Sequence, residues 1–410
     1  MQLFKILKSK NIIVRGIAMV LILLNSLVLT NYFGLELLGV YTTFVLYIGL
    51  SSQLFSLSFN SYALRVYSSV DLKDVGVYVF NNSIFQFLSF LLCLIIFKSI
   101  YPEVISKNYI LFGLLLFFTA SNAIIDNLFT GIGKPVKGAY LLIVRSLSIL
   151  IFVIINHFFN SQDLDLYKIL LISIILSELS ALLIFSYSLF MEEILNSKMF
   201  KFDLDFIRKG LISGTKLTIY SFLFLLTILL PRIILTLNEG DLVNLGKYQI
   251  NFLLTMAACN LLESSYSTSR LSELVPEMMK NKKINILDIL SEIKFYLVIL
   301  VCFALLMIML TNKISQYING VDLISILILS SNALLYFTYR SFYYRIYAGA
   351  YDRYLIVMNI IITIFSASSL YFLNSFFGYT GILLSTVINS FVMVVVSLWF
   401  IKNKINVSRV

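Results

Sequence analysis

Apolar runs of about 20 residues recur along the whole chain, separated by short segments that carry most of the charged side chains. A helix needs about 20 apolar residues to cross the hydrocarbon core of a bilayer. The pattern therefore predicts an all-α polytopic membrane protein with about twelve membrane-spanning helices. The predicted spans are residues 12–30, 39–59, 79–97, 109–128, 139–157, 167–189, 211–235, 246–265, 293–311, 321–343, 354–373 and 379–401.

The basic residues are unevenly divided between the two sides of the predicted membrane. With the N-terminus in the cytoplasm, the cytoplasmic segments hold twenty-one Lys and Arg residues, and the external loops hold three, Lys98, Lys107 and Lys313. Cytoplasmic loops of membrane proteins accumulate Lys and Arg. Adding or removing one mid-chain helix would exchange the two sides downstream and abolish the asymmetry. Both termini are therefore predicted to be cytoplasmic.

The two halves of the chain share a short motif at corresponding positions. Leu38-Gly39-Val40-Tyr41 begins the second span, and Leu245-Gly246-Lys247-Tyr248 begins the eighth span 207 residues later. A repeat of six spans keeps the same orientation in the membrane, because six is an even number. We therefore predict two six-helix lobes related by a parallel pseudo-two-fold axis. The predicted division is an N-terminal lobe at 1–190, a cytoplasmic linker at 191–210 and a C-terminal lobe at 211–410.

Composition narrows the class of protein. Hydrophobic residues make up 60% of the chain and charged residues 13%, whereas a soluble domain is about a quarter charged. The net charge of +10 follows from the basic cytoplasmic loops, so no nucleic-acid partner is expected. The chain has a single histidine, His157, and its three cysteines are far apart, which predicts no metal site.

The chain also lacks the sequence signatures of catalysis and of ATP binding. No nucleophile–base arrangement is evident, and Gly131-Ile132-Gly133-Lys134 has too few glycines for a phosphate-binding loop. We expect a transporter, not an enzyme, with no catalytic residues and no cofactor. Its energy is then expected to come from the substrate gradient or from coupling to Na⁺ or H⁺.

Ionisable side chains inside the spans are the candidate functional residues, because charge is costly in lipid and faces a cavity or a partner. Arginine binds phosphate oxygens through a bidentate fork, and tyrosine rings can stack on sugars. Each of these residues can also have a purely structural role. The basic side chains can extend to the membrane edge, and the tyrosines can form an aromatic belt at the interface. The substrate-binding candidates are Arg145, Arg232, Arg340, Arg345, Tyr339 and Tyr343.

We expect different roles for two acidic residues inside the spans. Glu178 lies near the centre of the sixth span, where it is either the partner of an arginine or an ion-coupling group. Glu263 lies near the inner end of the eighth span, and we expect it to pair with Arg270 or Lys216.

Three segments, together with the twelve spans, give the chain a family resemblance. They are the turn at Phe33–Tyr41, the segment Gly131–Pro135 and Leu245–Tyr248. The chain resembles polysaccharide transporters of the MOP exporter superfamily and, within it, an O-antigen flippase of the Wzx type. Relatives often carry an acid before the arginine late in the seventh span, whereas this chain has Pro231 before Arg232.

The resemblance implies a role in polysaccharide biosynthesis, specifically of lipopolysaccharide. The cargo would be an undecaprenyl-diphosphate-linked oligosaccharide, moved across the bacterial inner membrane by alternating access between two six-helix lobes. Its partners would be that lipid-linked sugar, the bilayer and the polysaccharide polymerase machinery.

Two other functions remain open. The first is an ion-coupled small-molecule exporter, like the multidrug members of the same superfamily, which needs a buried acid facing a cationic drug. Glu178 is the main mid-span acid against several bases, and this balance favours an anionic cargo. The second is a polysaccharide polymerase, but the longest external segments, near 98–108 and 157–166, are short for an active site.

Overall fold

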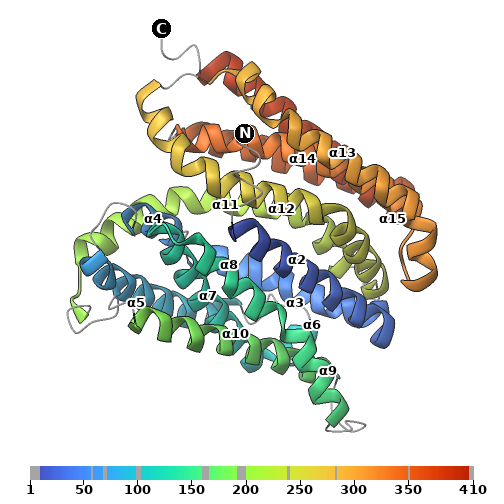
Figure 1. The fold of residues 1–410 in the computed structure, drawn as a ribbon, viewed down its shortest axis with the longest axis horizontal. Coiled ribbons are helices and arrows are strands. Elements are labelled where there is room, and N and C mark those ends of the chain that lie inside the picture. The colour runs from blue at the N-terminus through green and yellow to red at the C-terminus, as the bar shows by residue number, and fades with distance from the viewer. Residues whose placement is uncertain are drawn as a thin grey trace. The chain divides into compact units, whose positions relative to one another are not determined.

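The computed structural model describes residues 10–56, 59–67, 72–97, 103–158, 166–191, 200–237, 241–281, 284–349 and 351–405. Within these ranges the chain forms helices joined by short turns, without a strand (Figure 1). The first half contains α2 (Lys10–Val28), the π-helical turn η1 (Leu29–Phe33), α3 (Gly34–Phe55), α4 (Phe59–Tyr67), α5 (Leu72–Phe97), α6 (Glu103–Ser106), α7 (Tyr109–Gly131), α8 (Pro135–Ser146), α9 (Ser148–Phe158) and α10 (Leu166–Met191). The second half contains α11 (Leu204–Leu237), α12 (Leu242–Asn281), α13 (Ile286–Tyr317), α14 (Leu323–Ala348), α15 (Asp352–Phe400) and η3 (Ile401–Ile405).

The apolar helices have the lengths that a multi-pass membrane protein requires. Among the described residues, eight helical stretches are long and apolar enough to cross a membrane. The first and last of them, Ile13–Ser52 and Asp352–Asn403, have 40 and 52 residues, about twice the length of one span. Each therefore accounts for two predicted spans, while α5 and α12 lie on the third and eighth predicted spans. The all-α polytopic fold is thus confirmed.

Two apolar stretches are each divided where the sequence predicted separate spans. The π-helical turn η1 and Gly34, with φ of +86°, separate α2 from α3. Gly378, with φ of +53°, interrupts α15 between the predicted eleventh and twelfth spans. A positive φ favours glycine because a side chain is strained in that conformation.

Other boundaries differ from the sequence prediction. The predicted cytoplasmic loop at 266–292 is mostly helical, because α12 continues to Asn281 and α13 already begins at Ile286. The predicted fifth span is formed by α8 and α9, which are separated at Leu147. An apolar run marks the part of a helix that lies in lipid, and it does not mark where the helix itself ends.

The contacts divide the chain into two compact units, which are described separately here. The N-terminal unit contains Lys8–Val28 and Val40–Phe222, and the C-terminal unit contains Leu29–Gly39 and Leu223–Val410. In the N-terminal unit α2 packs on α8, and α10 packs on α7, α8 and α9. In the C-terminal unit α14 packs on α12, α13 and α15. The segment Leu29–Gly39 comes from the first half of the sequence but packs with the second half.

Many large apolar side chains point away from these cores. Ile110 on α7 and Met309 on α13 are each 79% exposed, and Phe376 on α15 is 77% exposed. Large apolar surfaces mark interaction sites or membrane contact. On helices of this length they are the faces that contact lipid.

A buried asparagine connects α12 to the turn that precedes α14. The side-chain amide of Asn251 donates to the carbonyl of Gly320 at 2.8 Å, and its oxygen accepts from the backbone N–H of Asp322 at 3.3 Å. Lys247, one turn earlier, forms an ion pair with Asp322 at 3.4 Å. Asn251 is fully buried, so these bonds hold the turn on α12 without competition from water.

We predict that Asn251→Leu lowers the free energy of unfolding by about 1–3 kcal/mol, because it leaves the partly buried carbonyl of Gly320 and N–H of Asp322 without this partner. The measurement is thermal unfolding of the detergent-purified protein. Asn312→Leu on the exposed face of α13 is the matched control. Equal midpoints for the two variants would contradict the structural role of Asn251.

Candidate functional site

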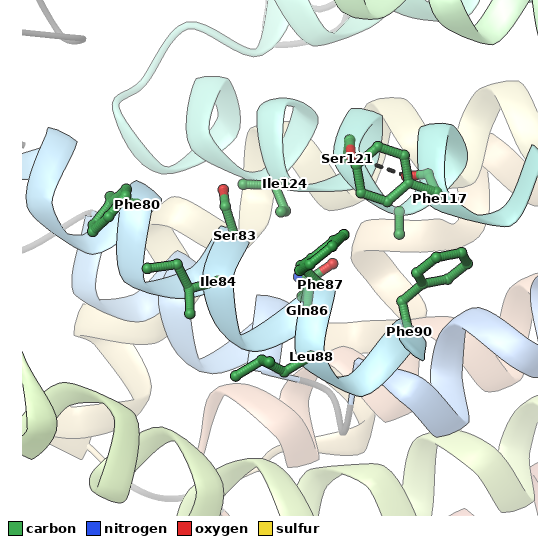
Figure 2. A pocket seen from close by; sticks show the side chains of 11 residues that line it. Phe80, Ser83, Ile84, Gln86, Phe87, Leu88, Phe90, Phe117, Ser121 and Ile124 are labelled. Carbon is green, nitrogen blue, oxygen red and sulfur yellow. Dashed lines mark hydrogen bonds between the residues drawn. The ribbon is translucent and has the colours of Figure 1, made fainter. Parts of the chain in front are cut away.

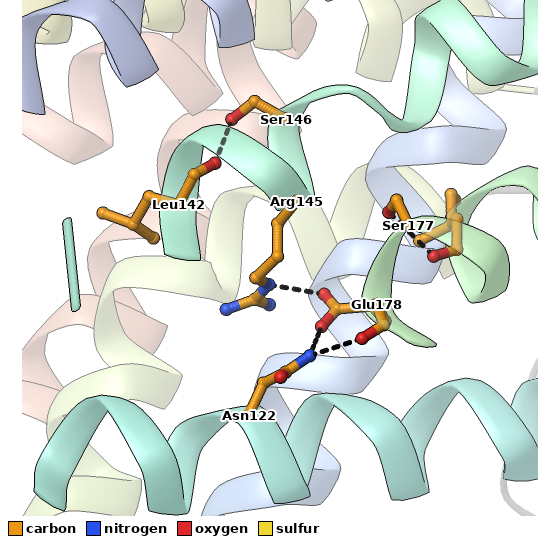
Figure 3. Close-up of polar contacts among 7 residues, drawn as sticks. Asn122, Leu142, Arg145, Ser146, Ser177 and Glu178 are labelled. Carbon is orange, nitrogen blue, oxygen red and sulfur yellow. Dashed lines mark hydrogen bonds and ion pairs between the residues drawn. The ribbon is translucent and has the colours of Figure 1, made fainter. Parts of the chain in front are cut away.

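The main polar cluster of the N-terminal unit joins three apolar helices (Figure 3). The Nε of Arg145 on α8 donates to Oε1 of Glu178 on α10 at 2.6 Å. The amide of Asn122 on α7 donates to the other carboxylate oxygen at 2.6 Å and to the Glu178 carbonyl at 2.9 Å. The side chain of Glu178 is 6% exposed and that of Arg145 is 29% exposed. The cluster therefore holds a buried carboxylate between a cation and an amide.

The arginine in this cluster keeps part of its hydrogen-bonding capacity. Only Nε of Arg145 is used by Glu178, and the two terminal nitrogens form no hydrogen bond with the described residues (Figure 3). Arg145 lies in the last turn of α8, directly before the break at Leu147. The break frees the carbonyl of Ser146, which accepts a hydrogen bond from the side chain of Asn25 on α2. Broken helices at membrane depth occur where protein groups or water satisfy the backbone.

A second acid lies on the same helix as Asn122. Asp126 follows it by four residues on α7, about one helical turn later, and faces α8. A Cβ at Gly138 of α8 would overlap the carboxylate of Asp126, so only glycine allows this approach. Asp126 interacts electrostatically with Arg15 and Arg145, and Arg145 in turn pairs with Glu178.

The corresponding cluster of the C-terminal unit is centred on Arg340 of α14. Its Nε donates to Oε1 of Glu263 on α12 at 2.7 Å, and Nη2 donates to the Tyr344 hydroxyl at 2.6 Å. The same hydroxyl donates to Glu263 at 2.5 Å, so the three groups form a closed triangle. Arg270 and Lys216, the partners expected for Glu263, have side chains outside the described residues, so that pairing stays a prediction. Among the described residues, Glu263 pairs with Arg340.

Aromatic rings enclose the guanidinium of Arg340. The rings of Tyr344, Tyr343 and Phe224 have their centroids 4.6, 4.9 and 5.0 Å from its central carbon. Phe224 also stacks on Tyr343, with centroids 5.5 Å apart and an interplanar angle of 16°. Tyr339 is fully buried next to Phe224, and its hydroxyl has no partner. Arg340 is thus held by one carboxylate and by aromatic faces, which stabilise a cation.

The remaining predicted bases have different environments. Arg345 on α14 is buried and pairs through Nη2 with Glu292 on α13. Arg232 on α11 lies over Phe252, with 4.5 Å from its central carbon to the ring centroid, and at 5.9 Å from Tyr248. Its buried Nε has no hydrogen-bond partner among the described residues. Within the described part of the chain, Arg232 has aromatic contacts but no acid.

A cavity of about 320 Å³ lies in the N-terminal unit between α5 and α7 (Figure 2). Gln86 lines it, and its buried Oε1 has no partner, because only its amide nitrogen bonds to Asn60 and Asn82. No charged side chain lines the cavity, which is mostly aromatic; its rings come from Phe80, Phe87, Phe90 and Phe117.

The sequence candidates thus fall into two clusters, the separate ion pair of Arg345 with Glu292, and Arg232, which has no acid partner among the described residues. Glu178 joins Arg145, while Tyr339 and Tyr343 join Arg340. The partners Asn122 and Glu292 were not predicted. Asn122 is a polar residue within an apolar run, four residues before Asp126, and this signal was available in the sequence. The described residues contain no group of three side chains that could hold a metal ion.

Comparison with solved structures identifies the fold. The chain is similar to two structures described as a multidrug resistance MATE family transporter of the MOP superfamily. The inward-facing one has a TM-score of 0.68 and 13% identity and covers 97% of this chain and 95% of the other. The outward-facing one has a TM-score of 0.68 and 12% identity and covers 98% of both chains. A mutant of a Vibrio cholerae MATE transporter has a TM-score of 0.70 and 11% identity, covering 97% and 96%.

No protein-family model and no curated protein sequence matches the chain. The structural similarity extends over nearly the whole chain, and at these identities it shows a shared fold. That fold agrees with the fold that the predicted resemblance implied. The finer resemblance to an O-antigen flippase is not supported by these neighbours, which are multidrug-type transporters.

We predict that Arg145 and Glu178 are energetically coupled. Glu178→Ala leaves a partly buried guanidinium without its carboxylate, so it should cost about 1–3 kcal/mol of unfolding free energy, and Arg145→Ala should also destabilise the protein. The double variant should be more stable than the sum of the two losses predicts. Thermal unfolding in detergent of the four proteins measures this cycle. Additive losses would show that the two side chains act independently.

Proposed function

We propose that the protein is a membrane exporter that works by alternating access and carries small amphipathic molecules, with coupling to an ion gradient. The observation that carries this proposal is the pairing of the embedded bases. Arg145, Arg340 and Arg345 each bind a carboxylate, so these three sites have little net charge. A diphosphate would have to displace an acid from each of them.

The same ion pairs place acidic side chains inside the apolar helices, as a small-molecule exporter requires. Such a protein requires embedded acids that can meet a cationic drug or an ion, and Glu178 was the main one recognisable in the sequence. Glu263 adds a second acid, because its carboxylate is only 15% exposed and lies among aromatic rings. Along the sequence, embedded bases outnumber embedded acids, and this excess favoured an anionic cargo. Within the two clusters, however, each arginine has a carboxylate partner.

The cavity between α5 and α7 also suits an amphipathic small molecule. Its volume of about 320 Å³ is at the lower end of the range of ligand pockets. Phenylalanine rings offer apolar surface and, through their faces, attraction for a cation. The free Oε1 of Gln86 offers one acceptor for a donor on the ligand. Without a charged lining, this cavity favours a lipophilic molecule over a phosphate.

Glu178 is the ion-coupling candidate. A buried carboxylate that exchanges a proton or Na⁺ can change its attraction to Arg145, and this change would alter how α8 and α10 are held together. Asn122 keeps two hydrogen bonds to Glu178 and its backbone, so the carboxylate stays positioned while its charge changes.

We predict that Glu178→Gln abolishes ion-driven transport without unfolding the protein, because the amide keeps the shape but cannot ionise. The measurement is accumulation of ethidium in proteoliposomes under an imposed pH or Na⁺ gradient. Asp288→Asn, which removes an exposed carboxylate in the first turn of α13, is the matched control. Gradient-driven ethidium uptake by Glu178→Gln equal to that of the parent would contradict the coupling role. Absence of uptake by the parent would contradict the small-molecule cargo.

A second candidate function is supported by Arg232. Its guanidinium is the described embedded base without an acid, and arginine is well suited to bind phosphate. This observation favours the flippase that the sequence resembles, in which an undecaprenyl-diphosphate-linked oligosaccharide crosses the bacterial inner membrane and supplies a polysaccharide polymerase.

We predict that, in a flippase, Arg232→Ala would abolish surface polysaccharide while Arg232→Lys would retain part of it, because lysine keeps the charge but loses the fork. The measurement is gel analysis of surface polysaccharide in a deletion strain carrying each variant, with lipid-linked repeat units assayed in each leaflet. Full units trapped on the inner leaflet after deletion would favour the flippase over the small-molecule exporter. Unchanged polysaccharide after deletion would exclude it.

A further inference from the structure

The glycine of each Leu-Gly-x-Tyr motif packs against the residue that lies three positions before the other motif. A Cβ at Gly39 would overlap the backbone carbonyl of Leu242, and a Cβ at Gly246 would overlap the backbone carbonyl of Leu35. Gly39 and Gly246 are 207 residues apart, and so are Leu35 and Leu242. The contact is therefore reciprocal, as expected when two copies of one motif pack about a two-fold axis. All four residues belong to the C-terminal unit.

One side of this contact is held rigidly. Asn251 and Lys247 attach the start of α12 to the turn before α14, through the Gly320 carbonyl and Asp322. The side chain of Leu35 lies directly over Gly320, where a Cβ would be 2.9 Å from its Cδ2. Gly246 and Gly320 thus form a surface without side chains, here called the floor, on which Leu35 packs.

The other side is attached through features that allow movement. The segment Leu29–Gly39 is preceded by α2 and is followed by the rest of α3 from Val40, and both of these flanking parts belong to the N-terminal unit. It begins with the π-helical turn η1, and Gly34 follows with φ of +86° and nothing within 4 Å of an added Cβ. Short π-helical insertions and glycines with positive φ are places where a helix can change direction.

The position of the contact gives it a function. Both motifs begin spans whose first residues are predicted to lie at the external side of the membrane. We propose that the starts of α3 and α12, which meet through Gly39 with Leu242 and Gly246 with Leu35, form the external gate of the transporter. In the closed state Leu29–Gly39 lies on the floor made by Gly246 and Gly320. Opening separates this segment from the start of α12 by bending at η1 and Gly34.

The two glycines are essential to closure because the contact is between backbones. Any side chain at Gly39 or Gly246 would force the carbonyl of the opposite helix start away. Gly16 and Gly49 lie in the neighbouring helices α2 and α3 with nothing within 4 Å of a Cβ. Alanine at those positions adds the same methyl group without affecting the gate. The role of this contact as a gate rests on the proposed transport function, whereas the opening of the contact can be tested without any cargo.

The experiment measures access from outside at Leu38, which is fully buried beside Gly39. Leu38→Cys is placed in a chain whose Cys93, Cys259 and Cys302 are replaced by alanine, and whole cells are labelled with a membrane-impermeant maleimide. We expect Gly246→Ala to raise the labelling rate about fivefold or more, because it shifts the population towards the open state. Gly49→Ala is the matched control and should leave the rate unchanged.

A second variant protects the test against misfolding. Leu35→Ala removes the side chain that lies over Gly320 and introduces no overlap, so it should raise the labelling rate in the same direction. Equal labelling rates in the parent, Gly246→Ala and Leu35→Ala would overturn the gate. Equally fast labelling in all variants, including Gly49→Ala, would also overturn it, since the contact would then not shield Leu38. Neither result depends on which molecule the protein transports.

Discussion

The high cost of an unpaired charge in lipid is the constraint on which the rest of this structure depends. Glu178 and Glu263 are placed on different helices, and each is met by an arginine from another helix. These pairs require α8 to face α10, and α12 to face α14, at those levels. A hydrophobic face can be satisfied by lipid as well as by another helix, so it cannot specify partners with the same precision. The ion pairs supply that specificity.

The same constraint changes how embedded bases are interpreted. Arginines in apolar spans suggest a cationic path for an anionic cargo when they are counted along a sequence. Once Arg145, Arg340 and Arg345 are paired with acids, each site is a dipole that an ion or a cation can perturb. Arg232 differs because it is held by aromatic faces alone. The choice between a small amphipathic cargo and a lipid-linked sugar therefore depends on whether a cluster or this isolated base contacts the cargo.

Glycine has a separate function where backbones approach. The reciprocal contact of Gly39 and Gly246 is built from the starts of α3 and α12, and each start provides both a glycine and, four residues earlier, the carbonyl that covers the other glycine. Duplication of a six-helix unit explains this arrangement directly, since equivalent residues meet at a two-fold axis. The MATE-like fold of the chain is consistent with such a repeat, although the identities with those transporters are only 11–13%.

The sequence by itself determined the class of protein and the number of spans. These depend on hydrophobicity and loop charge, which act locally along the chain. It also located Arg145, Glu178, Arg340 and Tyr343, because charge and aromatic residues stand out against apolar spans. Only the tertiary structure decided that Glu263 pairs with Arg340, that Asn122 supports Glu178 and that Leu35 lies on Gly246. These contacts join residues 56–211 positions apart, and their geometry depends on how helices rotate and cross. A hydropathy pattern specifies that a helix is in lipid but leaves its rotation and its neighbours undetermined.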